Sequence, residues 1–265
     1  MIHPTAVVAD GASIGDNVEI GPYAIIEDDA IIGDNCSIAA HAVVMKYSEI
    51  GQNSTIHHGA VIGNTPQDNH FGGEQSYVKI GSNCIIREYV TIHRGTEPES
   101  VTSVGNNVML MALSHLAHNV TLADGATITN SSLLGGYVYV GEGAFISGGV
   151  MIHQFVQVGR LAMVGGGSLV TQDIPPFCML QFGDIRGVNS VGLKRSGMSP
   201  DKRQDVRRAY KTFFREGLNS GEAITKIRES MPDSPVAEEF AGFIEGTKRG
   251  IQSGGNRHKK ARGQN

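Results

Sequence analysis

The chain lacks tryptophan altogether and has few aromatic or charged residues. Aromatic residues make up 6% of its 265 residues, and charged residues make up 18%. Because so few large side chains cannot fill a thick globular core, small and β-branched residues must supply most of the burial. The 40% of apolar residues and the net charge of -4 exclude a disordered chain, and the absence of a G-X-Y period excludes collagen. We therefore expect a folded chain with a thin, repetitive core.

Cysteine is scarce, and long apolar runs are missing. The three cysteines, Cys36, Cys84 and Cys178, are odd in number, far apart and in no C-x-x-C pair, so they encode neither a disulfide framework nor a zinc knuckle. A reducing, cytoplasmic location fits them best. The first residues form no basic and apolar leader, and no stretch approaches ~18 consecutive apolar residues. We expect no targeting segment and no stable membrane insertion.

Glycine, in contrast, is abundant: the 35 glycines are about 13% of the chain, against a usual ~7%. Their context is an internal repeat. Every sixth residue from Ile2 to Val170 gives 29 positions, and 26 of them hold Ile, Leu or Val. This regularity establishes a hexapeptide period. The exceptions lie in two stretches that we interpret as loops, at about 64–78 and 95–102, and they are Asp68, Glu74 and Pro98.

A second column of mostly small residues, such as Ala24 and Ala30, lies two positions before each aliphatic residue. Residues two apart share one face of an extended segment, so each hexapeptide points one small and one larger residue inward. Glycine often follows at the corner, where it tolerates a positive φ. Three hexapeptides would close one triangular coil of a parallel β-solenoid with coils about 4.8 Å apart. An inert scaffold or an ice-binding rod is the alternative that the repeat alone leaves open.

The six-residue period stops after Pro175 and Pro176 and gives way to helical spacing. Ser199 and Pro200 form a typical helix start. The amphipathic segments that we predict to be helices span residues 199–217, 220–228 and 235–247. The predicted domains are a β-helix over residues 1–190, a helical domain over 191–250 and a disordered basic tail over 251–265.

Positive charge is concentrated where the helices begin. Residues 1–193 contain 6 basic and 17 acidic residues, whereas residues 194–215 contain 8 basic and 2 acidic residues. Such a patch attracts an anionic partner: nucleic acid, a nucleotide diphosphate or an acidic carrier protein. An acidic chain without an aromatic stacking platform makes nucleic acid the weaker choice, and an ordinary solvated helix face is the alternative. The basic residues are Lys194, Arg195, Lys202, Arg203, Arg207, Arg208, Lys211 and Arg215.

The repeat also brings distant polar residues together. Positions 18 residues apart stack on one face of the solenoid, so His118, Gly136 and Gln154 form one column, with Tyr137 and His153 beside it. None of them occupies an inward position, so we expect these side chains to point outward. An outward histidine can act as a general base, because imidazole titrates near neutral pH. No nucleophile elbow or Ser-His-Asp pattern is visible, which suits direct transfer without a covalent enzyme intermediate.

Two other uses of these histidines must be weighed. His118 could be an ordinary surface residue. Alternatively, His93, His115 and His118 could converge on a metal ion, as histidines do across the trimer interface of hexapeptide-repeat γ-class carbonic anhydrases. The signature of those enzymes has a histidine pair five residues apart, whereas His115 and His118 are three apart. The spacing therefore argues against a metal site.

Several motifs extend beyond the repeat. They are Pro66-Gln67-Asp68, Ile86-Arg87-Glu88, Thr91-Ile92-His93-Arg94-Gly95-Thr96, Ala117-His118, Ile152-His153-Gln154-Phe155, Asp173-Ile174-Pro175-Pro176 and Gly192-Leu193-Lys194-Arg195. With the hexapeptide repeat they resemble the UDP-N-acetylglucosamine O-acyltransferases of lipid A biosynthesis, from residue 1 to about residue 251. That resemblance implies an all-β left-handed parallel β-helix with a C-terminal α-helical domain. The left hand departs from the usual right-handed crossover rule.

The resemblance also implies an activity. The family transfers a (R)-3-hydroxyacyl chain from acyl carrier protein to the 3-hydroxyl of UDP-N-acetylglucosamine. His118 matches the family's catalytic base, and the backbone N–H of Gly136 matches the oxyanion donor, a group typically worth about 3 kcal/mol in the transition state. No further cofactor is implied, because the phosphopantetheine of the carrier delivers the acyl group.

The same resemblance implies a set of binding residues and partners. The family is a homotrimer with active sites between subunits, and Arg195 would reach the nucleotide from a neighbouring subunit. The residues expected to bind substrate are Gln67, Asp68, His93, His115, Tyr137, His153, Gln154, Gly166, Asn189 and Arg195. The residues expected to receive the acidic carrier are Lys202, Arg203, Arg207, Arg208 and Lys211.

Some positions depart from the family pattern. Asn119 stands where many members have aspartate after the base, and Tyr137 stands where the family usually has histidine. Val191 and Ser196 replace residues that are often glutamate and arginine. These departures leave the chemistry intact but allow an amino-sugar acceptor that would give an amide-linked chain. Gly166 falls where the family gauges acyl length, and its missing side chain suggests room for a longer chain.

Overall fold

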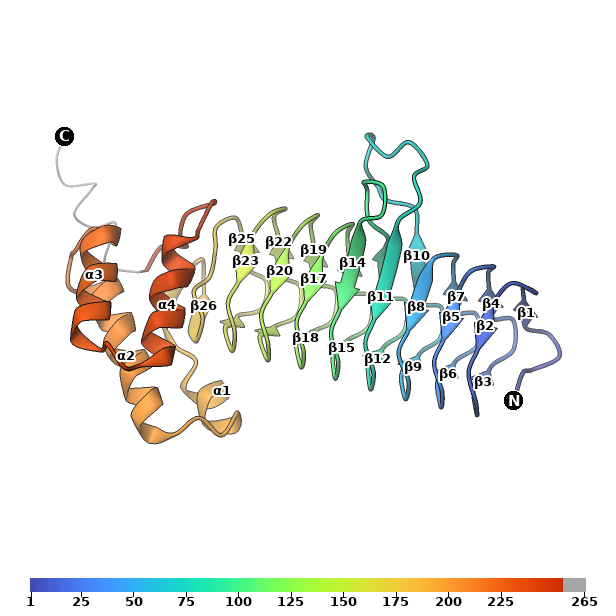
Figure 1. The fold of residues 1–265 in the computed structure, drawn as a ribbon, viewed down its shortest axis with the longest axis horizontal. Helices are drawn as coiled ribbons and strands as arrows, with labels where there is room; N and C mark the ends of the chain where they lie inside the picture. Colours follow the sequence, from blue (N-terminus) through green and yellow to red (C-terminus); the bar gives the residue numbers. More distant parts are fainter. Residues whose placement is uncertain (255–265) are drawn as a thin grey trace.

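The computed structural model describes residues 1–254 as a long parallel β-helix that ends in a group of helices (Figure 1). Each coil consists of three short strands joined by tight corners. The second residue of most corners has a positive φ, for example Asn35 at 57° and Tyr89 at 56°. Asparagine tolerates this left-handed conformation better than most residues.

The strands form three long sheets. Sheet B contains β1 (Val7–Val8), β4 (Ile25–Ile26), β7 (Val43–Val44), β10 (Val61–Asn64), β13 (Thr91–His93), β16 (His115–Leu116), β19 (Leu133–Leu134), β22 (Met151–Ile152) and β25 (Leu169–Val170). Sheet C contains β2 (Ser13–Ile14), β5 (Ile31–Ile32), β8 (Ser48–Ile50), β11 (Tyr77–Ile80), β14 (Val101–Val104), β17 (Thr121–Leu122), β20 (Tyr139–Val140) and β23 (Gln157–Val158).

Sheet A is the third side of the prism. It contains β3 (Glu19–Ile20), β6 (Ser37–Ile38), β9 (Thr55–Ile56), β12 (Ile85–Ile86), β15 (Met109–Leu110), β18 (Thr127–Ile128), β21 (Phe145–Ile146), β24 (Met163–Val164), β26 (Cys178–Gln181) and β27 (Asp184–Val188). All pairings between these strands are parallel except β26 with β27, which is antiparallel and closes the end of the prism. From β1 to β22 each strand pairs with the third strand after it, which confirms the predicted three-strand coil.

Two coils are longer than the rest because each contains a loop. Val43 pairs with Val61 in the ordinary 18-residue register. Val61, however, pairs with Thr91, and Thr91 pairs with His115, so these coils are 30 and 24 residues long. The additional residues form the connections 65–76 and 94–100, which project together from the β-helix (Figure 1).

The core is the thin one that the composition predicts. Both inward columns are buried: Ala24, Ala30, Ile26 and Ile32 are each at most 1% exposed. Because the inward residues of stacked coils contact one another along the whole prism, one continuous hydrophobic cluster runs into the helices. Burial of aliphatic side chains, at about 25 cal/mol per Å² of apolar surface, therefore stabilises the β-helix without large aromatic residues.

Four helices follow the last coil: α1 (Ser190–Arg195), α2 (Pro200–Arg215), α3 (Ser220–Ser230) and α4 (Pro235–Glu245). Ser199 caps α2 as expected, accepting a hydrogen bond from the Lys202 N–H. The sequence analysis missed α1, because this six-residue helix buries only Leu193 and so shows no amphipathic pattern. None of the helices within residues 1–254 has the length and apolar character needed to cross a membrane.

The prediction of a disordered tail from residue 251 is wrong for its first four residues. Ile251 forms a parallel bridge with Asp173, and Gly254 forms one with Ile185. A short extended segment there joins the last coil, which periodicity could not indicate because its partners are far apart in sequence. The rest of the predicted tail, residues 255–265, lies outside the described residues.

Candidate active site

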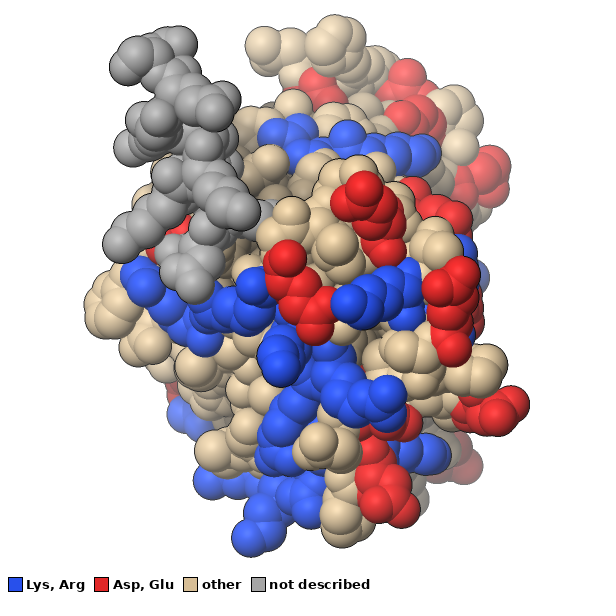
Figure 2. Space-filling model, turned by 90° about the vertical axis from the view of Figure 1, so that its left-hand side faces the viewer, with Lys and Arg blue, Asp and Glu red and all other residues tan. Residues whose placement is uncertain are grey.

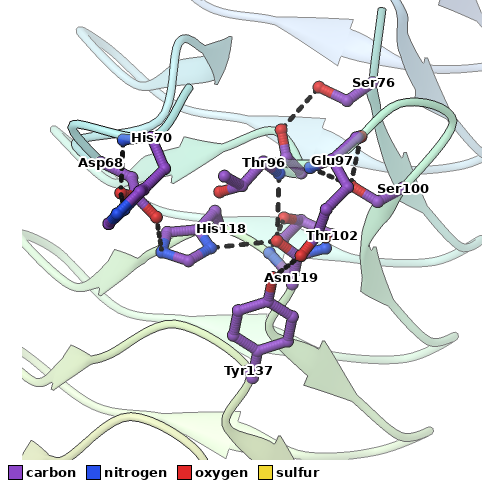
Figure 3. A network of polar contacts seen from close by, with 11 residues as sticks. Asp68, His70, Ser76, Thr96, Glu97, Ser100, Thr102, His118, Asn119 and Tyr137 are labelled. Atoms are coloured by element: carbon purple, nitrogen blue, oxygen red, sulfur yellow. Dashed lines mark hydrogen bonds and ion pairs between the residues drawn. The ribbon is translucent and has the colours of Figure 1, made fainter. Parts of the chain in front are cut away.

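His118, Gly136 and Gln154 lie at three successive coils of the corner between sheets B and C. The Tyr137 N–H donates to the His118 carbonyl oxygen at 3.1 Å, and the Phe155 N–H donates to the Gly136 carbonyl oxygen at 2.9 Å. These bonds join each corner to the next, which confirms the column derived from the 18-residue register. The two loops project near this same corner (Figure 3).

The His118 imidazole is held between two polar groups and one ring. Its Nδ1 lies 3.0 Å from Oδ1 of Asn119, and its Nε2 lies 3.6 Å from Oδ2 of Asp68. The Tyr137 ring stands edge-on to it, with the centroids 5.3 Å apart. The side chain is 12% exposed, so one edge of the ring remains open to a ligand. These contacts hold the ring in a fixed position, from which an imidazole can exchange a proton.

Gly136 lies directly against the imidazole. A Cβ on this residue would come within 2.5 Å of Cε1 and 2.6 Å of Nε2 of His118. Only glycine therefore lets the backbone approach the His118 imidazole so closely. Among the described residues, no acceptor for the Gly136 N–H is found. A free backbone donor beside a histidine is the arrangement that stabilises an oxyanion near a general base.

The loop 65–76 brings Asp68 to the site. Asp68 Oδ1 accepts a hydrogen bond from the His70 N–H at 2.9 Å and lies 3.0 Å from the His70 ring nitrogen. These two bonds, and then the nearby His118, hold the pKa of the Asp68 carboxyl below its usual range. Asp68 is therefore a carboxylate at neutral pH, with its second oxygen facing His118.

A buried arginine holds the same loop against the coil. The Arg94 guanidinium lies 5.2 Å from the Phe71 ring of the loop and 5.7 Å from the Tyr47 ring of the coil below. Arg94 is only 4% exposed, and its Nε has no hydrogen-bond partner in the described part of the chain. A desolvated cation between two aromatic rings is attracted to both. The sequence analysis missed this stack, because its three residues lie in different segments.

His93 and His115 lie beside His118, and His93 is the more deeply buried of the two. Their rings meet edge to face, with the centroids 4.9 Å apart, and His115 Nδ1 lies 2.7 Å from Oγ1 of Thr91. Burial, followed by the neighbouring His115 and His118, lowers the pKa of His93 to about 4. Burial also lowers the pKa of His115. Both are neutral at pH 7.

The role of His93 in substrate binding stays a prediction, and its surroundings in the single chain are closed. His93 is 4% exposed, and its buried Nδ1 has no hydrogen-bond partner among residues 1–254. It lies behind His115 and supports that ring. Within residues 1–254, no three His, Cys, Asp or Glu side chains are arranged to hold a metal ion.

Relatives and solved structures place the chain in a family. A family model described as UDP N-acetylglucosamine O-acyltransferase, domain 2, matches residues 173–252, and a bacterial transferase hexapeptide model matches residues 11–46 and 29–64. An acyl-[acyl-carrier-protein]--UDP-N-acetylglucosamine O-acyltransferase from Sulfurihydrogenibium is 48% identical over 261 residues, covering 97% of this chain and 96% of that protein. The chain belongs to the UDP-N-acetylglucosamine O-acyltransferases.

Crystal structures of this family agree with the fold. The UDP-N-acetylglucosamine acyltransferase from Bacteroides fragilis superposes with a TM-score of 0.93 at 41% identity, covering 95% of this chain and 99% of that one. The one from Francisella novicida gives 0.94 at 36% identity, covering 97% and 95%. The chain is thus a left-handed parallel β-helix with a C-terminal helical region, as predicted, and an acyltransferase. Neither a γ-class metalloenzyme nor an inert rod accounts for these relatives.

Other predicted residues of the acyltransferase lie around the same corner. Gln67 precedes Asp68 in the loop, and Gln154 lies one coil beyond Gly136 in the column, with His153 before it. All three side chains are exposed, so a ligand could reach them. Gly166 is exposed too but lies at the corner between sheets A and B, across sheet B from His118. A Cβ on Gly166 would lie 3.2 Å from the Gly148 carbonyl oxygen, so the backbone there is already closely packed.

Asn189 and Arg195 do not join His118 within one chain. Asn189 caps α1, accepting from the Gly192 N–H at 3.0 Å and donating to the Leu161 carbonyl oxygen at 2.9 Å. Arg195 is exposed at the end of the same helix. α1 lies on the side of the β-helix opposite the projecting loops (Figure 1). A role for either residue at a site of this kind therefore requires a second copy of the chain.

The basic residues of α2 form one face of the helical end. Lysines and arginines run across this end of the molecule (Figure 2). Arg208 is held by the Ser230 carbonyl oxygen at 3.2 Å and by Asp205 at 3.6 Å, whereas Arg203 is partly buried with its Nε unpaired in the described chain. The exposed members are Lys202, Arg207, Arg208, Lys211 and Arg215.

Proposed function

We propose that the chain transfers a (R)-3-hydroxyacyl group from acyl carrier protein to the 3-hydroxyl of UDP-N-acetylglucosamine, the first step of lipid A biosynthesis. The observation that supports this most strongly is the close approach of the Gly136 backbone to the His118 imidazole, which leaves no room for a Cβ on residue 136. One group can accept a proton there while the other donates a hydrogen bond, which is what acyl transfer to an alcohol needs.

The proposed reaction has two steps. Nε2 of His118 takes the proton of the sugar hydroxyl while that oxygen attacks the thioester carbonyl carbon. The Gly136 N–H donates a hydrogen bond to the resulting oxyanion. When the tetrahedral intermediate collapses, the C–S bond breaks and the phosphopantetheine thiolate leaves with the proton from the imidazolium. The products are the O-acylated sugar nucleotide and the free carrier thiol, and no further cofactor takes part.

A homotrimer with sites between subunits completes the proposal. Outward side chains of sheet B form an apolar row, with Leu133 44%, Met151 47% and Leu169 60% exposed. Contiguous apolar patches on a protein surface often mark a site that another protein covers. Packing of copies against this row would also let Arg195 of one chain reach the nucleotide bound at the His118 corner of the next.

The carrier would dock on the basic face of α2, formed by Lys202, Arg203, Arg207, Arg208 and Lys211. Acyl carrier protein is acidic, so complementary charge would steer it to this end of the molecule. A cytoplasmic location is part of the proposal, and the three free, buried cysteines suit a reducing compartment.

The test uses the purified protein with UDP-N-acetylglucosamine and a (R)-3-hydroxyacyl carrier. Release of the carrier thiol and formation of the acylated nucleotide are measured together. His118→Ala should lower kcat by about 10³-fold or more, whereas His58→Ala should not, because exposed His58 begins a corner between sheets A and B. Substantial turnover by His118→Ala would reject the mechanism.

The same assay determines the acceptor and the acyl chain. A 3-amino analogue of the nucleotide would give an amide instead of an ester, and hydroxylamine cleaves only the ester. A series of acyl lengths tests the expectation that Gly166 leaves room for a longer chain. Preference for the amino sugar would revise the acceptor but retain His118 as the base.

A further inference from the structure

Asn119 has a defined orientation. Its Oδ1 lies 3.0 Å from the Thr96 backbone nitrogen and 3.0 Å from Nδ1 of His118. A backbone N–H can only donate, so the atom facing it must be the amide oxygen. That oxygen can only accept, and therefore His118 must carry its proton on Nδ1. The lone pair of the neutral imidazole is then on Nε2, the nitrogen beside Gly136 and Asp68.

Thr96 is held in place by its own loop. The Tyr137 hydroxyl donates to the Glu97 carboxylate (Figure 3). Ser100 Oγ accepts from the Glu97 N–H at 3.0 Å and donates to the Glu97 carbonyl oxygen at 2.7 Å. Ser76 Oγ donates to the Gly95 carbonyl oxygen at 2.6 Å. The 94–100 connection is therefore tied down on both sides of Thr96.

Tyr137 contacts the base as well as the loop. Its ring stands edge-on to His118 and stacks on Phe155, with the latter centroids 4.9 Å apart and the planes inclined by 15°. Burial raises the pKa of Tyr137 to about 12, so its hydroxyl is a hydrogen-bond donor at any working pH. Tyr137 thus links the imidazole, the corner below it and the loop above it.

We propose that Asn119 and Tyr137 are coupled positioning residues that fix His118 in the Nδ1–H tautomer, with Thr96 and Glu97 as the connection between them. An imidazole without such partners can carry its proton on either nitrogen and can rotate. Loss of either residue would leave fewer molecules with Nε2 ready to accept the sugar proton. The proposal deepens the proposed function, because it rests on His118 acting as the general base.

Asn119→Asp gives the most specific test. A carboxylate accepts the same two hydrogen bonds, so the variant should fold, but its charge stabilises the imidazolium that forms behind it. The low-pH limb of the kcat profile should move to higher pH by about one unit, because the base must lose a more tightly held proton. A residue with a merely structural role would leave this limb unchanged, and that result would overturn the proposal.

Removal of the side chain tests tautomer control. Asn119→Ala should lower kcat by about 10- to 100-fold, with KM for the sugar nucleotide changed less than about threefold. Asn107→Ala is the matched control, because Asn107 has the same left-handed conformation, φ 56° against 59°, and no side-chain bond in the described structure. Both variants place alanine at a left-handed backbone position, so the conformational cost of the substitution is the same in the two. An equal loss in the two would overturn the proposal.

Coupling is measured with a double-mutant cycle. Tyr137→Phe keeps the ring but removes the bond to Glu97, and it should lower kcat by about three- to tenfold; in the Asn119→Ala background it should have little further effect. Tyr139→Phe is the control, because the exposed Tyr139 hydroxyl has no hydrogen bond in the described chain. Fully multiplicative losses would disprove coupling. Activity retained by His118→Ala would instead reject the proposed function itself.

Discussion

Two corners of the prism have the same backbone and different chemistry. The corner between sheets B and C contains His118, Gly136 and Gln154, whereas the corner between sheets A and B contains Asn130, Gly148 and Gly166 at the corresponding positions. The second residue of each turn is left-handed in both, for example at 60° for Tyr137 and 67° for Gly149. The repeat therefore specifies the turn but not its use, which depends on the side chains placed there.

The loops are the second difference between the two corners. Asp68 and Thr96, which lie in the connections 65–76 and 94–100, reach His118 and Asn119 at the first corner. An open turn on a solenoid is exposed on every side, whereas these loops enclose the imidazole until only 12% of it is accessible. Loops on a rigid scaffold commonly provide such functional groups.

The largest expected difference between the two corners is in the effect of Gly136→Ala and Gly148→Ala on kcat. The new Cβ at 136 would displace the imidazole, whereas the nearest atom to a Cβ at 148 is the Asn130 carbonyl oxygen at 3.4 Å. We expect kcat to fall about 10³-fold for the first variant, because the proposed base and the proposed oxyanion donor are both disturbed, and less than about threefold for the second. Size-exclusion chromatography checks that assembly is retained. Similar losses in the two variants would contradict the distinction.

The two corners should be equal in their contribution to stability. Leu134 ends the strand before Gly136, Ile146 ends the strand before Gly148, and both are fully buried. Truncation of either residue to alanine leaves a cavity in the same continuous core and should cost about 2–5 kcal/mol of unfolding free energy. Denaturant unfolding measures both. A much smaller loss of unfolding free energy for Leu134→Ala than for Ile146→Ala would contradict this expectation.

Acid should lower the free energy of unfolding more through the buried histidine beside the His118 corner than through a histidine at the other corner. His93 is neutral in the folded protein down to pH about 4, whereas an unfolded histidine takes up a proton near pH 6.5. The unfolded chain therefore binds more protons between these values, so this contribution, on the order of 3 kcal/mol, is fully present above pH 6.5 and is lost as the pH falls toward 4. His93→Gln should flatten the decline measured by denaturant unfolding.

His41→Gln is the control for that measurement. His41 is an exposed residue of the corner between sheets A and B, stacked on Tyr23 with the centroids 5.3 Å apart. Its replacement should leave the acid decline as steep as in the original protein. If both variants, or neither, flattened the curve, burial of His93 would not be the cause.

Much of this comparison could be predicted from the sequence, because the repeat is local. Inward Ala and Ile columns fix the coil, and the 18-residue register then places His118 next to Gly136 without any knowledge of side-chain contacts. The loop contacts could not be predicted, because Glu97 and Tyr137 are 40 residues apart and no period relates them. The capping role of Asn189 and the burial of His93 likewise depend on segments that pack only in three dimensions.

Arg94→Met tests whether the Arg94 side chain holds the loop 65–76 in place over the His118 corner. The change keeps the buried stem but removes the cation between Tyr47 and Phe71. Loss of this attraction should loosen the loop that carries Asp68 and lower kcat/KM by about tenfold. The melting temperature should change little, because an unpaired buried charge costs about as much as the ring contacts stabilise.

Lys46→Met is the matched control for the anchor. The Lys46 ammonium lies 5.3 Å from the same Tyr47 ring, but it is exposed, and within residues 1–254 no hydrogen bond or ion pair joins it to the loop 65–76. We expect a change in kcat/KM of less than about twofold, since an exposed cation–ring contact is weak. An equal effect of both substitutions would assign the loss to Tyr47 and the coil. A larger effect of Arg94→Met alone would assign it to the loop, and hence to the feature that distinguishes this corner from the other.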